Sequence, residues 1–190
     1  MTQRWLHGAA LSLLAFVAGC SSDAPSSASA PGARVSTSPT TEASTPEEAA
    51  AKAATPVLRE LIQVSDAARQ DPGARDWEPE IRRHAADPAA YLAVQSVREY
   101  ATLGLRQNGN TQFDVKVTDV QLASPAGPSV KLTGCYDSGS TQVVDADTGA
   151  AVPPGTPDRY VWDVTVVQYQ SEAGSPWLVT TLDPRTDQPC

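Results

Sequence analysis

The segment TGCYDSGSTQVVDADTG, residues 133–149, holds a cysteine, a tyrosine, three aspartates and several hydroxyl side chains. Such a set could bind a metal ion or supply a nucleophile. An EF-hand calcium loop needs ligands at positions 1, 3 and 5, glycine at position 6 and glutamate at position 12. Counted from Asp145, Gly149 falls at position 5 and Thr156 at position 12. The segment therefore predicts a hairpin turn in which Gly149 supplies a positive φ, and it predicts no metal site.

Cys20 ends a short apolar run at the N-terminus and could carry a lipid. The run GAALSLLAFVAG follows a start that contains Arg4, and small residues precede the cysteine. These features are typical of a secretory signal peptide, here residues 1–19. The run is shorter than the roughly 20 residues that span a bilayer. Residues 17–20, VAGC, resemble the lipobox of bacterial lipoproteins, in which the cysteine is diacylated. The alternative is a secreted protein in which Cys20 has no role.

Cys135 and Cys190 are the two cysteines that remain for the folded part. An even number of cysteines outside the cytoplasm predicts a disulfide. A free reactive thiol and a metal-binding pair are the alternatives. A structural zinc site needs about four cysteine or histidine ligands, and His84 is the only histidine after residue 20. The cysteines therefore favour a covalent link over a metal site.

His84 is also the only histidine that could join a catalytic triad after residue 20. It follows Arg82 and Arg83, and basic residues are typical of the last turn of a helix. The sequence has no G-x-S-x-G nucleophile elbow. We therefore expect His84 to have a structural role at a helix end.

Composition divides the rest of the chain into a linker and one domain. Residues 20–46 consist largely of serine, threonine, proline and alanine. They cannot bury enough apolar surface to offset the entropy of ordering, so they predict a disordered linker. Residues 47–190 are long enough for one domain. The formal net charge is -8 and basic residues do not cluster, which excludes nucleic acid as a partner.

Hydrophobic spacing predicts helices in the first half of the domain. Thr55 and Pro56 suit a helix start, because proline fits the first helical position. The predicted helices cover residues 55–70, 76–86 and 87–106.

The second half changes to the alternation that predicts strands. The predicted strands lie within residues 112–122, 129–136, 141–152, 159–170 and 176–182. A slip in the alternation predicts a bulge near Thr118 and Asp119. Helices followed by strands with short turns predict an α+β fold, with the helices packed on a curved antiparallel sheet.

This order of elements resembles the cone-shaped fold of the nuclear transport factor 2-like superfamily, also called ketosteroid isomerase-like or polyketide cyclase-like. The segments LGLRQNGNTQFDVKV, GCYDSG, VVDADTG and WLVTTLDPRTDQPC are similar to those of a group of uncharacterised lipoproteins of high-GC Gram-positive bacteria. The resemblance covers about residues 55–190.

The resemblance implies a pocket inside the cone. Enzymes of this shape use an aspartate general base, with a tyrosine or a protonated aspartate as hydrogen-bond donor to the oxyanion. Asp163 and Tyr136 are the candidates for these roles. Asp163 alternates with Tyr160 and Trp162 along its strand, so it points into the pocket only if these aromatic residues point out. The fold alone does not imply catalysis, and we name no catalytic residue.

The sequence as a whole predicts a lipid-anchored protein at the outer face of the cytoplasmic membrane. Cys20 would attach it to the membrane, and the domain would bind an envelope protein or a small apolar ligand without catalysing a reaction. Trp162 and Trp177 would either fill the core or form the floor of a small pocket. An isomerase-like or cyclase-like enzyme is the alternative. The sequence predicts no cofactor and no metal, and it does not indicate an oligomeric state.

Overall fold

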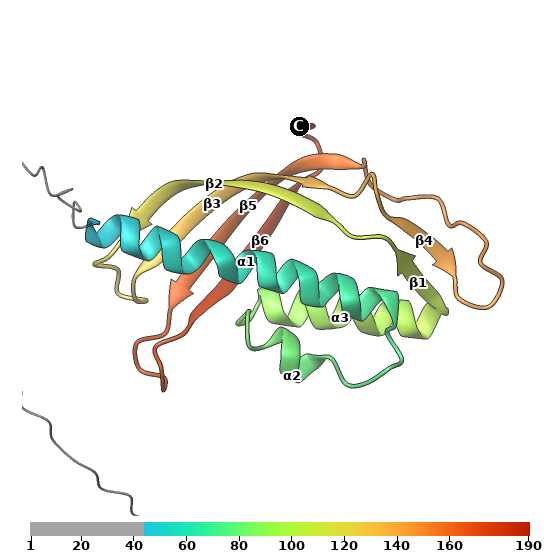
Figure 1. Ribbon diagram of the computed structural model, residues 1–190, viewed down its shortest axis with the longest axis horizontal. Helices are drawn as coiled ribbons and strands as arrows, with labels where there is room; N and C mark the ends of the chain where they lie inside the picture. Colours follow the sequence, from blue (N-terminus) through green and yellow to red (C-terminus); the bar gives the residue numbers. More distant parts are fainter. Residues whose placement is uncertain (1–43) are drawn as a thin grey trace, which may run out of the picture. The chain divides into compact units, whose positions relative to one another are not determined.

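The computed structural model describes residues 44–190, which form three helices followed by six strands (Figure 1). The helices are α1 (Pro46–Gln70), α2 (Glu78–Ile81) and α3 (Ala89–Leu103). The strands are β1 (Leu105–Asn108), β2 (Gln112–Gln121), β3 (Ser129–Asp137), β4 (Gln142–Asp145), β5 (Arg159–Gln168) and β6 (Trp177–Arg185). This order confirms the α+β prediction. Cys20, the predicted signal peptide and nearly all of the predicted linker lie outside the described residues.

Helix α1 starts at Pro46, so the predicted start at Thr55 and Pro56 was wrong. The Thr45 hydroxyl accepts a hydrogen bond from the Glu48 N–H at 3.1 Å, and the Glu48 carboxylate accepts one from the Thr45 N–H at 2.9 Å. This reciprocal capping box satisfies two N–H groups at the helix start. Thr55 has Leu58, not an acidic residue, three positions later. Pro56 instead lies inside the helix.

The other two helices are shorter than predicted. Helix α2 is a single turn, and α3 ends at Leu103 because Gly104 adopts a left-handed conformation with φ 64°. The chain then enters β1, whose first two residues the sequence predicted as helix. Strand β1 pairs antiparallel with β4, and the two form a separate sheet at one end of the domain (Figure 1).

The main sheet is antiparallel, in the order β2-β3-β5-β6, and it arches over α1 and α3 (Figure 1). The register of β2 shifts between Val117 and Asp119, which confirms the predicted bulge. A second shift lies between β5 and β6, where Thr165 pairs with Thr181 and Val166 with Val179, so β6 carries the extra residue. Bulges bend the strand that carries them and increase its twist. At Gly134 a side chain would collide with the carbonyl oxygen of Asp114 in the neighbouring strand, so glycine permits this close approach.

The core lies between the two helices and the concave side of the sheet. It combines buried aliphatic residues from α1, α3, β3, β5 and β6, among them Leu58, Leu61, Val94, Val97, Val130, Leu132, Val164, Val166 and Val179. Within residues 44–190, no helix is both long enough and apolar enough to cross a membrane.

Candidate functional site

Strand alternation gives the main sheet an inner face, toward the helices, and an outer face. Leu132, Tyr136 and Trp162 are on the inner face, and Cys135 and Asp163 are on the outer face. Tyr160 and Trp162, with which Asp163 alternates, thus both lie on the inner face. Because the aromatic residues point inward, Asp163 points outward. The structure therefore does not bring the two sequence candidates, Asp163 and Tyr136, together.

On the outer face, Asp163 is held by neighbouring side chains. One carboxylate oxygen accepts a hydrogen bond from the Thr133 hydroxyl at 2.7 Å, and the other lies 3.3 Å from Nε of Arg185. The Asp163 side chain is 42% exposed. Asp163 therefore forms an exposed ion pair on the outer face of the sheet.

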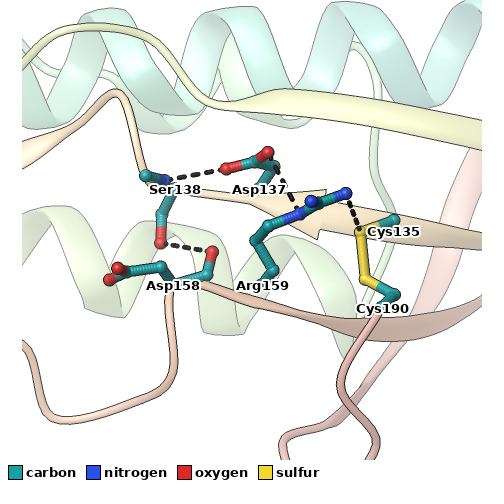
Figure 2. Close-up of a disulfide and its surroundings, with 7 residues drawn as sticks. Cys135, Asp137, Ser138, Asp158, Arg159 and Cys190 are labelled. Atoms are coloured by element: carbon teal, nitrogen blue, oxygen red, sulfur yellow. Dashed lines mark hydrogen bonds and ion pairs between the residues drawn. A yellow bond between two sulfur atoms is a disulfide. The ribbon is translucent and has the colours of Figure 1, made fainter.

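The outer face also carries the disulfide between Cys135 and Cys190 (Figure 2). The Cα atoms are 5.8 Å apart across 55 residues of sequence, and the predicted pairing is confirmed. The segment after β6 also accepts a hydrogen bond at the carbonyl of Gln188 from the Val161 N–H, at 3.0 Å. The disulfide links this segment covalently to β3, and the hydrogen bond holds it to β5. Disulfides are typical of oxidising compartments outside the cytoplasm.

The Asp145 segment forms the predicted turn. The Asp145 carboxylate accepts hydrogen bonds from the Thr148 N–H at 2.8 Å and the Thr148 hydroxyl at 2.7 Å. These bonds hold the pKa of Asp145 below its ordinary value, and Gly149 has φ 71°. In the described part of the chain, no group of three or more histidine, cysteine, aspartate or glutamate residues is placed to hold a metal ion.

His84 packs between a helix and the sheet. Its Nδ1 atom lies 3.2 Å from the Glu60 carboxylate of α1, and its carbonyl accepts a hydrogen bond from the Val179 N–H of β6 at 2.9 Å. These contacts connect the segment after α2 to both α1 and β6. They support a structural role for His84.

A hollow lies against the inner face and consists of two adjoining chambers. The apolar chamber, of about 260 Å³, is lined chiefly by Leu61, Ile62, Ala93, Trp162, Leu182 and Pro184. The polar chamber, of about 570 Å³, is lined by Tyr100, Gln107, Tyr160 and the loop around residues 151–156. Arg69, Ser96 and Tyr136 line both chambers. Together the chambers offer a space of the size typical of small-molecule sites.

Aromatic side chains form one wall of this hollow. The rings of Tyr136 and Trp162 are stacked, with centroids 4.5 Å apart and planes 3° apart. Phe113 meets Trp162 edge-on at 6.1 Å, and Tyr160 lies 5.4 Å from Tyr136. Of the two tryptophans considered from the sequence, Trp162 lines the apolar chamber and Trp177 packs against the core. Such contacts fix the orientation of the rings.

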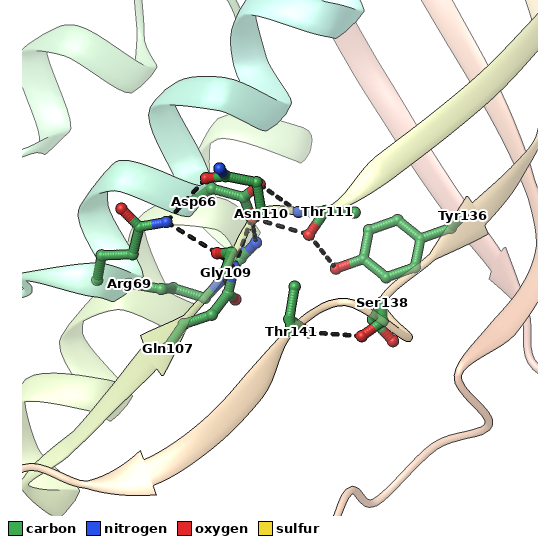
Figure 3. A network of polar contacts seen from close by, with 10 residues as sticks. Asp66, Arg69, Gln107, Gly109, Asn110, Thr111, Tyr136, Ser138 and Thr141 are labelled. Carbon is green, nitrogen blue, oxygen red and sulfur yellow. Dashed lines mark hydrogen bonds and ion pairs between the residues drawn. The ribbon is translucent and has the colours of Figure 1, made fainter.

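A polar network connects Arg69, which lines both chambers, to Gln107 and Thr111, and Figure 3 shows its side chains. Its centre is Asp66, which is only 3% exposed. One carboxylate oxygen accepts hydrogen bonds from Arg69 Nη2, Gln107 Nε2 and the Thr111 hydroxyl at 2.7, 2.8 and 2.8 Å, and the other accepts one from the Thr111 N–H at 2.7 Å. Three of the four bonds therefore end on Oδ1 and one ends on Oδ2.

The junction retains donors that the network does not use. Arg69 donates from Nε to Gln107 at 2.8 Å and from Nη2 to Asp66, but its Nη1 group has no hydrogen-bond partner within residues 44–190. The hydroxyl of Tyr136 lies 3.4 Å from the Thr111 hydroxyl, whose proton is directed at Asp66. The Tyr136 hydroxyl is therefore the donor in this long contact.

Burial affects two tyrosines that line the polar chamber. It raises the pKa of both Tyr100 and Tyr160 above the ordinary value of 10.0. The indole N–H of Trp162 is close enough to the Tyr160 hydroxyl to oppose the rise in the pKa of Tyr160. It nevertheless forms no hydrogen bond of acceptable geometry among the described residues.

Sequence reasoning missed the centre of the network. Leu58, Ile62 and Asp66 recur every four residues and therefore lie on one face of α1. A carboxylate that continues the apolar face of a helix must find buried partners. This signal was present in the sequence and identifies Asp66, but it does not identify Gln107 or Thr111, which come from β1 and from the segment before β2.

Comparisons with known proteins place the chain in no family. No protein-family model matches it, and no curated protein is significantly similar to it. Among solved structures, the intermembrane space region of the chloroplast protein ARC6 matches with a TM-score of 0.46 and 15% sequence identity. The match covers 75% of this chain and 98% of that chain.

Proposed function

We propose that this chain is a lipid-anchored lipoprotein whose domain binds a small apolar ligand without catalysing a reaction. The observation that carries the binding function is the two-chambered hollow beside the stacked rings of Tyr136 and Trp162. Ligand sites are concave and mostly apolar, with a few polar groups that orient the ligand. Arg69, Ser96 and Tyr136, which line both chambers, are placed to do this. An open hollow favours a small ligand over the alternative of an envelope protein as the partner.

The isomerase-like alternative has one observation in its favour. Asp66 is buried, and Thr111 links it to the hydroxyl of Tyr136. A general base, however, needs an oxygen within hydrogen-bond reach of a substrate proton. Asp66 already accepts four hydrogen bonds, and Asp163 lies on the other face of the sheet. We therefore prefer binding to catalysis.

Binding can be tested with N-phenyl-1-naphthylamine, an uncharged probe that fluoresces in apolar surroundings. The full chain with Cys20→Ser, which cannot be acylated at that residue, should enhance the fluorescence of the probe. Ala93→Trp should abolish the enhancement, because Ala93 lines the apolar chamber and a larger side chain fills it. Ala123→Trp is the matched control, because Ala123 is exposed and lines neither chamber.

The result is interpretable only if both variants fold, which far-ultraviolet circular dichroism and a thermal melt would establish. Enhancement that is equal in the wild type, Ala93→Trp and Ala123→Trp would place the probe elsewhere on the protein and refute the proposal. A wild type that gives no enhancement would refute it as well.

Attachment to the membrane is the second part of the proposal. It rests on the lipobox-like residues 17–20 and on the disulfide, which is typical of proteins outside the cytoplasm. A diacylated cysteine binds a membrane stably, whereas a single acyl chain gives marginal binding. The helices that precede a curved antiparallel sheet also support the resemblance to nuclear transport factor 2-like lipoproteins.

The attachment is tested by metabolic labelling with an alkyne-bearing fatty acid in a bacterial host. Wild-type protein should be labelled and should sediment with membranes. Cys20→Ala should be unlabelled, while Cys190→Ala, which removes a cysteine of the domain, should keep its label. Equal labelling of the wild type and Cys20→Ala would exclude a lipid on Cys20.

A further inference from the structure

The junction of the two chambers selects the chemistry of the ligand. We infer that the hollow takes an uncharged molecule with an apolar body and a hydrogen-bond acceptor oxygen, held by Arg69 and Tyr136. This inference rests on the proposed binding function and specifies the ligand class. Its apolar body would occupy the apolar chamber, and its oxygen would lie where Arg69, Ser96 and Tyr136 line both chambers.

The first argument is the balance of donors and acceptors. A guanidinium and an indole can only donate hydrogen bonds. Among residues 44–190, Arg69 uses Nε and Nη2 in the network and leaves Nη1 accessible, whereas Trp162 Nε1 lacks an acceptor but is sealed from the hollow. The nearby acceptor, Asp66, already accepts three hydrogen bonds at Oδ1 and one at Oδ2. An acceptor oxygen of a ligand can therefore replace water at Nη1 of Arg69.

The second argument is charge. The charge of Arg69 is already balanced by Asp66, whose Oδ1 lies 2.7 Å from Nη2. A charged ligand would lose its hydration without meeting an unpaired opposite charge, which is strongly unfavourable. An anion would also approach Asp158, an exposed residue that lines the polar chamber. An uncharged acceptor avoids both penalties and still satisfies the donors.

The third argument is shape. The apolar chamber is bounded by aliphatic side chains on the helix side and by Trp162 on the sheet side. A flat or compact apolar body can pack against the stacked pair of Trp162 and Tyr136. The hydroxyl of Tyr136 lies at the end of one of these rings, so a single tyrosine contributes both to the apolar wall and to the polar junction.

The inference can be tested with four compounds that share a naphthalene body. These compounds are 2-acetonaphthone, which is an uncharged acceptor, the anion 2-naphthoate, the cation 2-naphthylmethylammonium, and 2-ethylnaphthalene, which lacks oxygen. Their affinities are measured by displacement of N-phenyl-1-naphthylamine from the full chain with Cys20→Ser. We expect 2-acetonaphthone to bind at least about tenfold more tightly than either ion. Tighter binding of the anion or the cation would overturn the inference.

Tyr136→Phe separates the hydrogen bond from the shape of the site, because it removes only the hydroxyl. It should weaken the binding of 2-acetonaphthone by about fivefold, the usual effect of one neutral hydrogen bond. The binding of 2-ethylnaphthalene should not change. Tyr91→Phe is the control, because Tyr91 is 53% exposed and lines neither chamber. Equal weakening of both compounds would show that the hydroxyl does not hold the oxygen, and would refute the assigned role of Tyr136.

The outcomes also distinguish this inference from the proposed function. If the fluorescent probe binds but all four compounds displace it equally well, the acceptor selectivity is wrong and the binding function stands. If the probe does not bind, the proposed function itself fails, and the inference fails with it.

Discussion

The inner and outer faces of the main sheet are built from the same strands but have different chemical roles. Neighbouring residues separate these roles: Tyr136 lines the hollow, while Cys135, one position before it, forms the disulfide. Trp162 lines the apolar chamber, and Asp163, one position later, joins a network of exposed charges. Side chains alternate between the faces of a strand, so one short sequence serves two purposes.

The contrast between the two faces shows that stabilising groups on the outer face leave the hollow on the inner face open. The outer face supplies a covalent link and surface ion pairs, whereas the inner face supplies the core, the aromatic wall and the buried network around Asp66. We therefore expect changes on the outer face to alter stability and leave binding intact. Changes at the hollow should alter binding, and at Asp66 they should alter both.

The largest effect is expected from loss of the outer-face disulfide. Cys135→Ser with Cys190→Ser should lower the free energy of unfolding by about 4 kcal/mol, the chain-entropy value for a bridge that spans 55 residues. Urea unfolding measures the loss, and the affinity for N-phenyl-1-naphthylamine under native conditions should stay the same. A variant that folds but no longer binds the probe would show that the outer face also affects binding.

A smaller loss is expected when the centre of the inner network is removed. Asp66→Ala should lower the free energy of unfolding by about 3 kcal/mol, because it leaves Arg69 half-buried without its counter-charge. Asp163→Ala is the matched change on the outer face. The Asp163 ion pair is exposed, so its loss should be below about 1 kcal/mol. Similar losses for the two variants, measured by urea unfolding, would contradict the contrast.

The close approach of β2 and β3 gives a third comparison. Gly134→Ala places a methyl group against the Asp114 carbonyl oxygen, and the strain should destabilise the domain by about 2 kcal/mol. Lys131→Ala, at an exposed position of the same strand, should change stability by less than about 0.5 kcal/mol. Thermal or urea unfolding measures both, and a Gly134→Ala variant as stable as the wild type would show that the strands can separate there without cost.

The smallest effect concerns alkaline pH. Burial raises the folded-state pKa of Tyr160 above its ordinary value of 10.0. Its stabilising contribution is complete below the unfolded pKa and is lost as the pH rises through the folded value. Tyr160→Phe should therefore show a smaller fall in unfolding free energy between pH 8 and pH 11 than the wild type. Parallel curves for the two proteins would show that Tyr160 does not contribute.

The strands were more predictable than the helix ends because alternation is a local signal. The bulge at Thr118 and Asp119 and the face shared by Tyr160 and Trp162 both follow from the pattern of apolar residues. The pairing of Cys135 with Cys190 followed from the count of cysteines.

The start of α1 was less predictable because two Thr-Pro pairs compete for it. Thr45 and Thr55 are both followed by proline, and only Thr45 has a glutamate three positions later to complete the capping box. The end of α3 depended on the left-handed Gly104, which the apolar pattern overlooks. In both places a single capping residue outweighs the periodicity.

The candidate site was the least predictable part, because its polar groups meet only in the folded chain. Gln107 and Thr111 reach Asp66 across 41 and 45 residues of sequence. Asp66 lies on the apolar face of α1, so the sequence indicates that its carboxylate is buried. No pattern in a single sequence identifies the residues that bind to it. Tyr136 was identified as a candidate, and the structure associates it with Arg69 instead of with Asp163.

The position of Cys190 in the chain has a consequence for the order in which the protein matures. Strands β2 and β3 can pair as soon as both have been synthesised, because they are consecutive and antiparallel. The thiol of Cys135 has to wait until β5 and β6 have followed, because its partner comes after both. Any chain interrupted before residue 190 keeps a free thiol at Cys135. The disulfide can therefore form only after all four strands of the main sheet have been synthesised.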